Sequence, residues 1–366
     1  MLSKFINLFP SSVLTHRRAE RPEDVRGPYF RDQTAIIHSL AFRRLKHKTQ
    51  VFFSPENDHI CTRIEHSLHV ASISATICKA LNLDTELAHA IGLGHDLGHA
   101  PFGHAGESAL NHLMKKPFIH EVHSLRVADK LENYGKGLNL TFAVRDGIIS
   151  HCGEVDEQFI EIAHQPNNLE AADSRPVNPS TWEGCVVRIS DSIAYLGRDL
   201  EDAIKANLIT IDDIPKGIRT SLGIKNSDII NKLVFDVIDW SKKNGKIGYS
   251  PGMFDLLKEF KQFSRIHIYA NPKMEYWNDY SEMVLKSIYR YLCQLFEKNH
   301  ADFDAYATSK TALDRKFGNY IKALQEIYAV NDFDRDTILT DYIAGMTDSY
   351  ALHCFENILT TGTTGL

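Results

Sequence analysis

Long apolar runs are missing from this 366-residue sequence, although hydrophobic residues make up 43% of it. A membrane-spanning helix needs about 20 consecutive, mostly apolar residues, and no such stretch occurs. The opening segment does not resemble a secretory signal, because its short apolar stretch ends at Pro10 and no small-residue cleavage site follows. These absences exclude an integral membrane protein and predict a cytoplasmic protein without membrane contact.

Cysteine is scarce, and no CxxC pair is present. In a chain of this length, scattered cysteines are typical of reduced core residues rather than of a disulfide framework or a thiolate metal site. The six positions are Cys61, Cys78, Cys152, Cys185, Cys293 and Cys354. We therefore expect them to be unpaired.

Positive charge is in the minority, with a net charge of −6, which argues weakly against a general nucleic-acid binder. The exception is the segment from His16 to Phe53, where nine Arg or Lys residues face four acids, a difference of +5. Two interpretations of this basic segment remain open. It forms a solvated surface, or some of its cations point into a site for a polyanion such as a polyphosphate.

The alternating pattern of half-buried strands is also scarce, whereas apolar residues often recur at helical spacing. We predict an all-α fold with minor β at most, near residues 246–249 and at 48–53. The helix over 65–81 is expected to bury a stripe formed by Leu68, Ala71, Ala75, Cys78 and Leu81. Further helices are expected over residues 34–45, 84–94, 108–114, 120–134, 144–151, 179–205, 279–297 and 341–356. Residues 1–19 form an N-terminal segment, 20–207 a catalytic core, and 208–366 a mainly helical region packed on that core.

Histidine, by contrast, is abundant, with 18 residues, and His95, His99 and His104 fall within ten positions. The pair His95–Asp96 ends a predicted helix, where both side chains can face one cation. Imidazole and carboxylate together suit a borderline or hard divalent metal. His66 and Asp191, on two other predicted helices, would complete a site that leaves positions open for water and substrate. The sequence therefore predicts a site for one divalent cation at His66, His95, Asp96 and Asp191.

This order of ligands, with further matching blocks, resembles the deoxyguanosinetriphosphate triphosphohydrolase (dGTPase) family of the HD-domain metal phosphohydrolase superfamily. The most specific block is HDLGHAPFGHAGE at 95–107. Matching blocks lie at 41–45 (AFRRL), 48–52 (KTQVF), 63–67 (RIEHS), 137–141 (GLNLT), 191–195 (DSIAY) and 341–348 (DYIAGMTD). The similarity spans residues 20–355. It implies an HD-domain helical bundle with an additional helical C-terminal half.

The resemblance implies hydrolysis of a deoxynucleoside triphosphate at the α-phosphorus, giving the deoxynucleoside and inorganic triphosphate. His104 and Glu107 would form the catalytic dyad, either protonating the leaving group or activating the attacking water, and His99 would support the chemistry. Arg63 would contact phosphate as a planar cation with several donors. His120 would support the site.

The same resemblance assigns the deoxyribose contacts. Gln50 and Asp199 would contact the 3′-hydroxyl, and Tyr195 would stack under the sugar and exclude a ribose hydroxyl. Asp191, Tyr195 and Asp199 are spaced by four residues and so share one helix face. A basic residue of some relatives is replaced by Ser192 after the final metal ligand, so the triphosphate contacts are expected to differ.

Several features stay open at this stage. The metal is expected to be Mg²⁺ or Mn²⁺, with Co²⁺, Ni²⁺, Fe²⁺ or Zn²⁺ as alternatives, and the substrate is dGTP or several dNTPs. The resemblance implies a homo-oligomer, a tetramer or hexamer, and allows single-stranded DNA or a nucleotide as an effector. The alternative enzyme is another HD phosphohydrolase, a 5′-nucleotidase or phosphodiesterase. A non-catalytic nucleotide sensor is the alternative outside enzymes, disfavoured by the intact metal ligands and His104–Glu107 pair.

Overall fold

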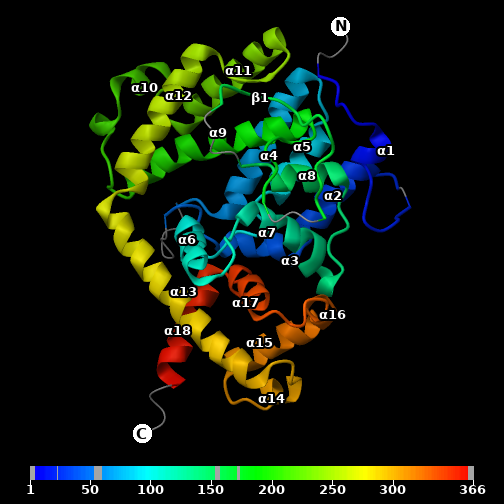
Figure 1. Ribbon diagram of the computed structural model, residues 1–366. Helices are drawn as coiled ribbons and strands as arrows, with labels where there is room; N and C mark the ends of the chain where they lie inside the picture. Colours follow the sequence, from blue (N-terminus) through cyan, green and yellow to red (C-terminus); the bar gives the residue numbers. More distant parts are fainter. Residues whose placement is uncertain (1–4, 23, 53–59, 153–156, 171–173, 362–366) are drawn as a thin grey trace.

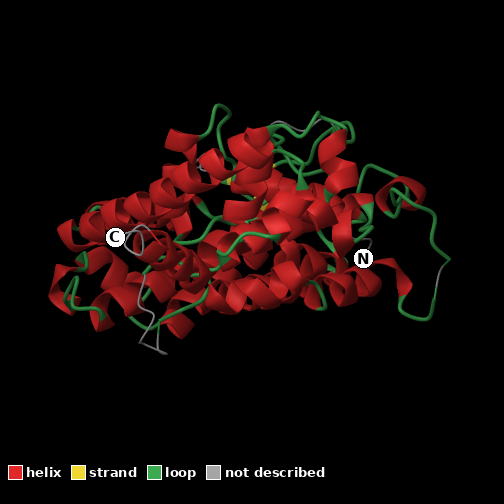
Figure 2. Ribbon diagram, turned by 90° about the horizontal axis from the view of Figure 1, so that it is seen from below, coloured by secondary structure: helices red, strands yellow, loops and turns green. Residues whose placement is uncertain are grey.

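The computed structural model describes residues 5–22, 24–52, 60–152, 157–170 and 174–361. Within these ranges the chain forms eighteen α-helices and one sheet of two short strands, which confirms the all-α prediction (Figures 1 and 2). The strands β1 (Phe159–Ile160) and β2 (Ile247–Gly248) pair antiparallel, with Phe159 opposite Gly248. β2 lies where the sequence predicted minor β structure.

The first half of the chain builds the part of the fold that carries the predicted metal ligands. Its helices are α1 (Ser11–Leu14), α2 (Gly27–Ile37), α3 (Leu40–Arg44), η1 (Leu45–His47), α4 (Arg63–Leu81), α5 (Thr85–Gly94), α6 (Gly103–Leu113), α7 (His120–Arg126), η2 (Val127–Leu131), η3 (Asn133–Gly135), α8 (Phe142–Ile149) and α9 (Trp182–Lys205). The long helix α4 packs along both α5 and α9. These three helices therefore form the frame on which the site is built.

The second half adds a curved wall of helices, whose long member α13 runs down one side of the molecule in Figure 1. Its helices are η4 (Ile211–Asp213), α10 (Lys216–Ser221), α11 (Asn226–Asn244), α12 (Pro251–Ser264), η5 (Arg265–Tyr269), α13 (Pro272–Asn299), α14 (Phe303–Ala307), α15 (Ala312–Ala323), α16 (Gln325–Ala329), α17 (Arg335–Ala344) and α18 (Asp348–Thr361). Helix α13 packs against α6, α17 and α18. None of the helices in the described ranges is both long enough and apolar enough to cross a membrane.

Two large hydrophobic cores hold the fold together. The first contains α4, α5, α8 and α9 and extends to Met274, so α10–α12 pack with the first half of the chain. The second contains the helices after residue 280 together with Phe102, Leu110 and Phe118 from the first half. The predicted domain boundary at residue 207 stays a prediction. Side chains from residues 100–118 of the first half pack in the same core as the helices after residue 280.

Three local expectations were wrong, for identifiable reasons. The helix predicted over 34–45 is interrupted, because the side chain of Ser39 accepts from Phe42 N and starts a new helix, α3. The helix predicted over 341–356 is two helices, α17 and α18, separated at 345–347, where Thr347 Oγ1 accepts from Tyr350 N. Leu68 is 48% exposed, because α4 buries its faces toward α5 and α9 and Leu68 lies on the outward side.

Candidate active site

A cavity of about 580 Å³ opens where α4, the loop after α5, α7, α9 and α12 meet. Ten of the twelve predicted site residues line it: Gln50, Arg63, His66, Asp96, His99, His104, His120, Asp191, Tyr195 and Asp199. The remaining two, His95 and Glu107, contact lining residues directly. The structure therefore brings all twelve together around one cavity.

Local sequence signals place the first ligands. Helix α4 begins with a capping box in which Thr62 and Glu65 satisfy each other's backbone N–H groups, so Arg63 and His66 lie one turn apart at the start of the helix. The loop after α5 approaches α7 closely at Gly98, where an added Cβ would lie 2.2 Å from Ser124 N. A glycine is therefore required for the loop to carry His95 and His99 past α7.

The four predicted metal ligands converge. His66 Nε2 lies 2.9 Å from Asp191 Oδ1, and His95 Nε2 lies 3.5 Å from Asp96 Oδ2. His95 Nε2 is also 3.9 Å from Asp191 Oδ1, which links the two pairs. All but Asp191 are almost fully buried, and Asp191 faces the cavity.

The chemistry of His95 fits a metal ligand. Burial lowers its pKa to about 4, so the imidazole is neutral. Its Nδ1 lies 2.7 Å from the Gly92 carbonyl and donates to it, which leaves the Nε2 lone pair facing the carboxylates. Nε2 is buried and has no hydrogen-bond partner among the described residues. A buried acceptor is costly to leave unpaired, and a cation held by this set of two imidazoles and two carboxylates would satisfy it.

Arg63 adds positive charge beside these ligands. Its guanidinium lies 2.5 Å from Asp96 Oδ2 and donates a second, longer hydrogen bond of 3.3 Å to the Gln50 carbonyl. Burial opposes ionisation of Asp96, but the surrounding His95 and Arg63 hold its pKa well below the usual range. Asp96 is therefore a carboxylate, as a metal ligand must be.

A second cluster surrounds Glu107. Its closest partner is His120, whose Nδ1 lies 3.1 Å from Oε1 and 3.2 Å from Oε2, whereas His104 Nδ1 is 3.6 Å from Oε2. His104 is 73% exposed and faces the cavity, while His120 is buried. Burial disfavours charge on His120, but the hydrogen bond that its Nδ1 donates to Glu107 and the charge of Glu121 outweigh it and raise its pKa to about 9. Glu107 thus orients two imidazoles, one buried and one exposed.

The imidazole rings form a continuous belt that joins the two clusters. Ring centroids are 5.2 Å apart for His66–His95, 4.8 Å for His95–His151, 5.3 Å for His151–His120, 4.5 Å for His120–His99 and 5.6 Å for His99–His104. His151 is the member that the sequence did not predict as a site residue. His151 lies two residues after the end of α8. Its position at the end of the predicted helix over 144–151 was the only sequence feature that could have indicated a site residue.

The same cavity holds the residues predicted to contact the sugar. Asp199 is buried and accepts a 2.7 Å hydrogen bond from Tyr269 Oη. Burial raises the pKa of Asp199 to about 7 despite that hydrogen bond. Gln50 Oε1 is buried and has no hydrogen-bond partner in the described part of the chain. Tyr195 lines the cavity from α9, one turn from Asp199.

Two cations in the lining were not predicted. Arg188 lies on α9 one turn before Asp191, and Lys261 comes from α12. Arg188 Nη1 donates to the Val177 carbonyl at 2.6 Å, and burial lowers its pKa. Lys261 and the lining residue Tyr269 follow the site residues of α9 by more than 60 positions in the sequence, so no spacing pattern could link them to the site. The fold alone brings them in.

Residues 344–348, here called the strap, hold the loops of this site in place through hydrogen bonds. Lys48 Nζ donates to the carbonyls of both His99 and Ala344. Asp348 accepts from Thr49 N at 2.8 Å and from Phe102 N at 2.9 Å. The end of the matching block at 341–348 therefore positions the segments carrying Gln50 and His99.

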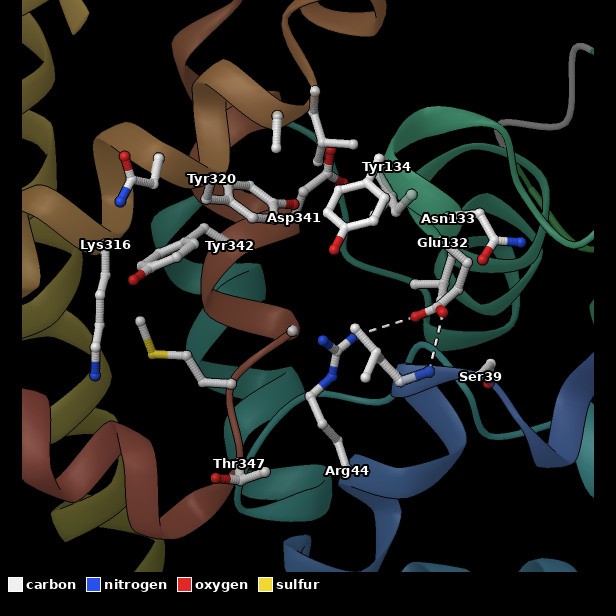
Figure 3. A pocket seen from close by; sticks show the side chains of 18 of the residues that line it. Ser39, Arg44, Glu132, Asn133, Tyr134, Lys316, Tyr320, Asp341, Tyr342 and Thr347 are labelled. Atoms are coloured by element: carbon white, nitrogen blue, oxygen red, sulfur yellow. Dashed lines mark hydrogen bonds and ion pairs between the residues drawn. The ribbon is translucent and has the colours of Figure 1, made fainter.

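A second cavity, of about 570 Å³, is lined in part by the strap residues 345–347 and contains none of the predicted site residues (Figure 3). Tyr320 and Tyr342 form one wall, with ring centroids 5.0 Å apart. Arg44 reaches in from α3 and pairs with Glu132 at 3.6 Å, and Glu132 also accepts from Leu40 N at 3.0 Å. The strap thus lines the second cavity and hydrogen-bonds the segments that carry residues of the first.

Known proteins resemble this chain over most of its length. Residues 63–196 match the HD domain family, and residues 247–357 match the phosphohydrolase-associated domain family. A deoxyguanosinetriphosphate triphosphohydrolase-like protein of Caldanaerobacter subterraneus is 39% identical over 93% of this chain and 87% of its own length. Proteins of the same description from Desulfatibacillum aliphaticivorans and Clostridium tetani are 39% and 36% identical, each over 93% of this chain and over 90% and 87% of their own lengths.

Proposed function

Because the chain belongs to the dGTPase-like family of HD-domain phosphohydrolases, we propose that it hydrolyses deoxynucleoside triphosphates at the α-phosphorus, releasing deoxynucleoside and inorganic triphosphate. The family establishes a metal-dependent hydrolase, and the identity of the substrate is what we propose. The predicted dependence on a divalent cation at His66, His95, Asp96 and Asp191 is part of it.

One observation carries the proposal: three of the proposed metal ligands line the same cavity as Gln50, Tyr195 and Asp199, the residues proposed to contact the sugar, and His95 contacts Asp96 in that lining. Arg63 links the two sets, because its guanidinium donates to Asp96 and to the Gln50 carbonyl. A 5′-nucleotidase or phosphodiesterase needs the ligands alone. A cavity that also presents Arg63, Arg188 and Lys261 suits a ligand with several phosphates.

The reaction requires a water to attack the α-phosphorus and the bond from phosphorus to the 5′ oxygen to break. A divalent cation held by the four ligands would supply Lewis acidity toward the phosphate and favour ionisation of bound water. The Glu107 cluster supplies the protons. Charged His120 is held by Glu107 at 3.1 Å, and His104 Nδ1 lies 3.6 Å from the same carboxylate. A proton held at His120 can therefore pass by way of Glu107 to the exposed imidazole of His104 and from there to the departing 5′ oxygen.

Sugar recognition follows from other residues that line the cavity. The unpaired Gln50 Oε1 and the Asp199 carboxyl offer acceptors for a 3′-hydroxyl. Tyr195 lines the same cavity, and its proposed role is to stack under the sugar and exclude a 2′-hydroxyl. These contacts favour deoxynucleotides over ribonucleotides whatever the base. None of the described residues that line the cavity is assigned to the base, so the proposal covers dGTP alone as well as several dNTPs.

A product assay tests the proposal. The purified protein is incubated with each dNTP, GTP and dGMP in Mg²⁺ or Mn²⁺, and the products are separated by ion-exchange chromatography. We expect deoxynucleoside and intact triphosphate from dNTPs, with no turnover by Asp96→Ala. Orthophosphate or pyrophosphate as the first product, or turnover of dGMP alone, would favour the alternative phosphohydrolase. Turnover that needs a second nucleotide or single-stranded DNA would identify an effector.

The assembly proposed from the family is a homo-oligomer, a tetramer or hexamer. Exposed apolar residues on the second half, such as Tyr276, Met283 and Val330, offer surface for such contacts. Light scattering of the purified protein measures the mass directly, and a monomer would contradict this part of the proposal.

A further inference from the structure

A cysteine and two histidines outside the predicted ligand set meet on one wall of the active-site cavity. His120, His151 and Cys152 each place one ligand atom within 4.8 Å of those of the other two. The sequence predicted no thiolate metal site, because no two cysteines are close in the chain. The fold instead brings one cysteine beside two imidazoles.

Both imidazoles are held in the orientation that metal-binding histidines adopt. His120 Nδ1 faces the Glu107 carboxylate at 3.1 Å, and His151 Nδ1 faces the Ile148 carbonyl at 2.6 Å. An acceptor at one ring nitrogen fixes the tautomer and leaves the other nitrogen free to bind a cation. Glu107 and the α8 carbonyl therefore act as the outer partners of two preset ligands.

The distance between Cys152 Sγ and His120 Nε2 matches the distance between two ligand atoms of one zinc ion. His120 Nε2 lies 3.6 Å from Cys152 Sγ. Tetrahedral zinc with Zn–N of about 2.0–2.1 Å and Zn–S of about 2.3 Å places such a pair about 3.6 Å apart. A hydrogen bond between the Cys152 thiol and His120 would explain why these two side chains lie close together. It would not explain why His151 also places a ligand atom within 4.8 Å of both.

Asp191 lies between this cluster and the predicted catalytic ligands. Its Oδ1 is 2.9 Å from His66 Nε2, and its Oδ2 is 3.9 Å from Cys152 Sγ. One carboxylate can thus face a cation on each side. The two sites differ in chemistry, because the first offers only nitrogen and oxygen, while the second offers a thiolate that selects soft cations.

We propose that His120, His151 and Cys152 form a second cation site, selective for thiophilic Zn²⁺, and that Zn²⁺ bound there inhibits the enzyme. Binding displaces two protons to solvent, one from the Cys152 thiol and one from Nε2 of the charged His120 ring, and forms one Zn–S and two Zn–N bonds, with the fourth position taken by water or Asp191. It also occupies the His120 nitrogen that faces the cavity, so that histidine can no longer move a proton. The inhibition rests on the proposed function, whereas the metal site does not.

Cobalt is the probe that separates the two sites. Co²⁺ is added to the metal-free full-length protein, and the near-ultraviolet absorption of sulfur-to-cobalt charge transfer is recorded. We expect this band in the wild type, and expect its loss in Cys152→Ser. It should persist in Cys293→Ser, a control at a half-buried cysteine on α13, and in Asp96→Ala, which damages only the first site. Absence of the band, or its persistence in Cys152→Ser, would overturn the site whatever the activity. Circular dichroism confirms that each variant is folded.

A second measurement tests the inhibition. Zn²⁺ is titrated into enzyme already supplied with Mn²⁺ and dNTP, and each variant is normalised to its own zinc-free rate. Cys152→Ser should require at least about tenfold more Zn²⁺ for half inhibition, since even the outer partners of metal ligands are worth ~10–100-fold in affinity. The same zinc sensitivity in Cys152→Ser and wild type would overturn the inhibitory role. An enzyme with no dNTP activity would refute the proposed function while leaving the cobalt result to decide the site.

Discussion

Glu107 holds His120 with both carboxylate oxygens, at 3.1 and 3.2 Å from Nδ1, and lies farther, at 3.6 Å, from His104. The family resemblance names His104 and Glu107 as the dyad. The geometry adds His120 as the buried partner that shares the same carboxylate. A proton can therefore be held at His120 and presented at His104, which faces the cavity.

Replacement of His120 tests this arrangement. His120→Asn keeps a polar side chain but removes the titrating ring, and we expect kcat to fall by about 10²–10⁴-fold, the usual worth of a positioned acid or base. KM should change little, because His120 is not one of the residues proposed to contact the sugar. Steady-state kinetics with a dNTP measures both constants. His112→Asn, at an exposed histidine on α6, is the control, and an unchanged kcat in His120→Asn would contradict the proton-holding role.

Burial of Asp199 predicts a pH-dependent stability. Its pKa is raised from 3.8 to about 7, so between these values the folded protein keeps a proton that the unfolded chain has lost. The carboxyl therefore favours folding most at low pH, and this contribution falls as the pH rises from about 4 to 7. Asp199→Asn does not titrate, so its Tm relative to wild type should rise through that window and level off above it. A difference in Tm that is constant from pH 4 to 8 would contradict the shift.

The unpaired oxygen of Gln50 predicts a specific effect on 3′-hydroxyl recognition. With a dNTP, Gln50→Leu should lower kcat/KM by on the order of tenfold, the loss of one hydrogen bond. With a 2′,3′-dideoxynucleoside triphosphate, which lacks the hydroxyl, the same replacement should have almost no effect. Measurement of the four rates isolates the contact. Equal losses with both substrates would mean that Gln50 acts on shape or on phosphate instead.

The cation on α12 predicts a contact with the polyphosphate. Lys261→Ala should raise KM for dNTPs about tenfold or more, because a hydrogen bond to a charged group is worth about 1.5–3 kcal/mol. Lys258→Ala, on the same helix but outside the cavity lining, should leave KM unchanged. Initial-rate kinetics decides between them. Equal KM values for the two variants would remove Lys261 from the substrate contacts.

The sequence predicted the part of this molecule that depends on local spacing. Helical periodicity gave the all-α fold, and Asp191, Tyr195 and Asp199 share a face of α9 because four residues make about one turn. The helix predicted to end at His95–Asp96 is α5, which ends at Gly94, but the predicted helix over 108–114 begins earlier, at Gly103 of the histidine-rich block. These inferences need no knowledge of distant contacts.

The parts that the sequence missed depend on contacts between distant segments. Tyr269 hydrogen-bonds Asp199 across 70 residues, and Lys48 reaches Ala344 across 296. Cys152 was predicted to be a core thiol, but the turn after α8 places it beside His120. The break of the 341–356 segment was missed because Asp348, the first residue of α18, accepts from Thr49 N and Phe102 N, which lie far away in the sequence. Periodicity within one helix carries no signal for such pairings.

Isotopic labelling of the product tests the central claim most directly, because it reports which bond breaks. The enzyme is allowed to hydrolyse a dNTP in water enriched in ¹⁸O, and the products are analysed by mass spectrometry. Attack on the α-phosphorus predicts one ¹⁸O atom in the inorganic triphosphate and none in the deoxynucleoside. Label in the deoxynucleoside would mean attack at the 5′ carbon, and label in orthophosphate or pyrophosphate would mean cleavage at another phosphorus; either result would contradict the account.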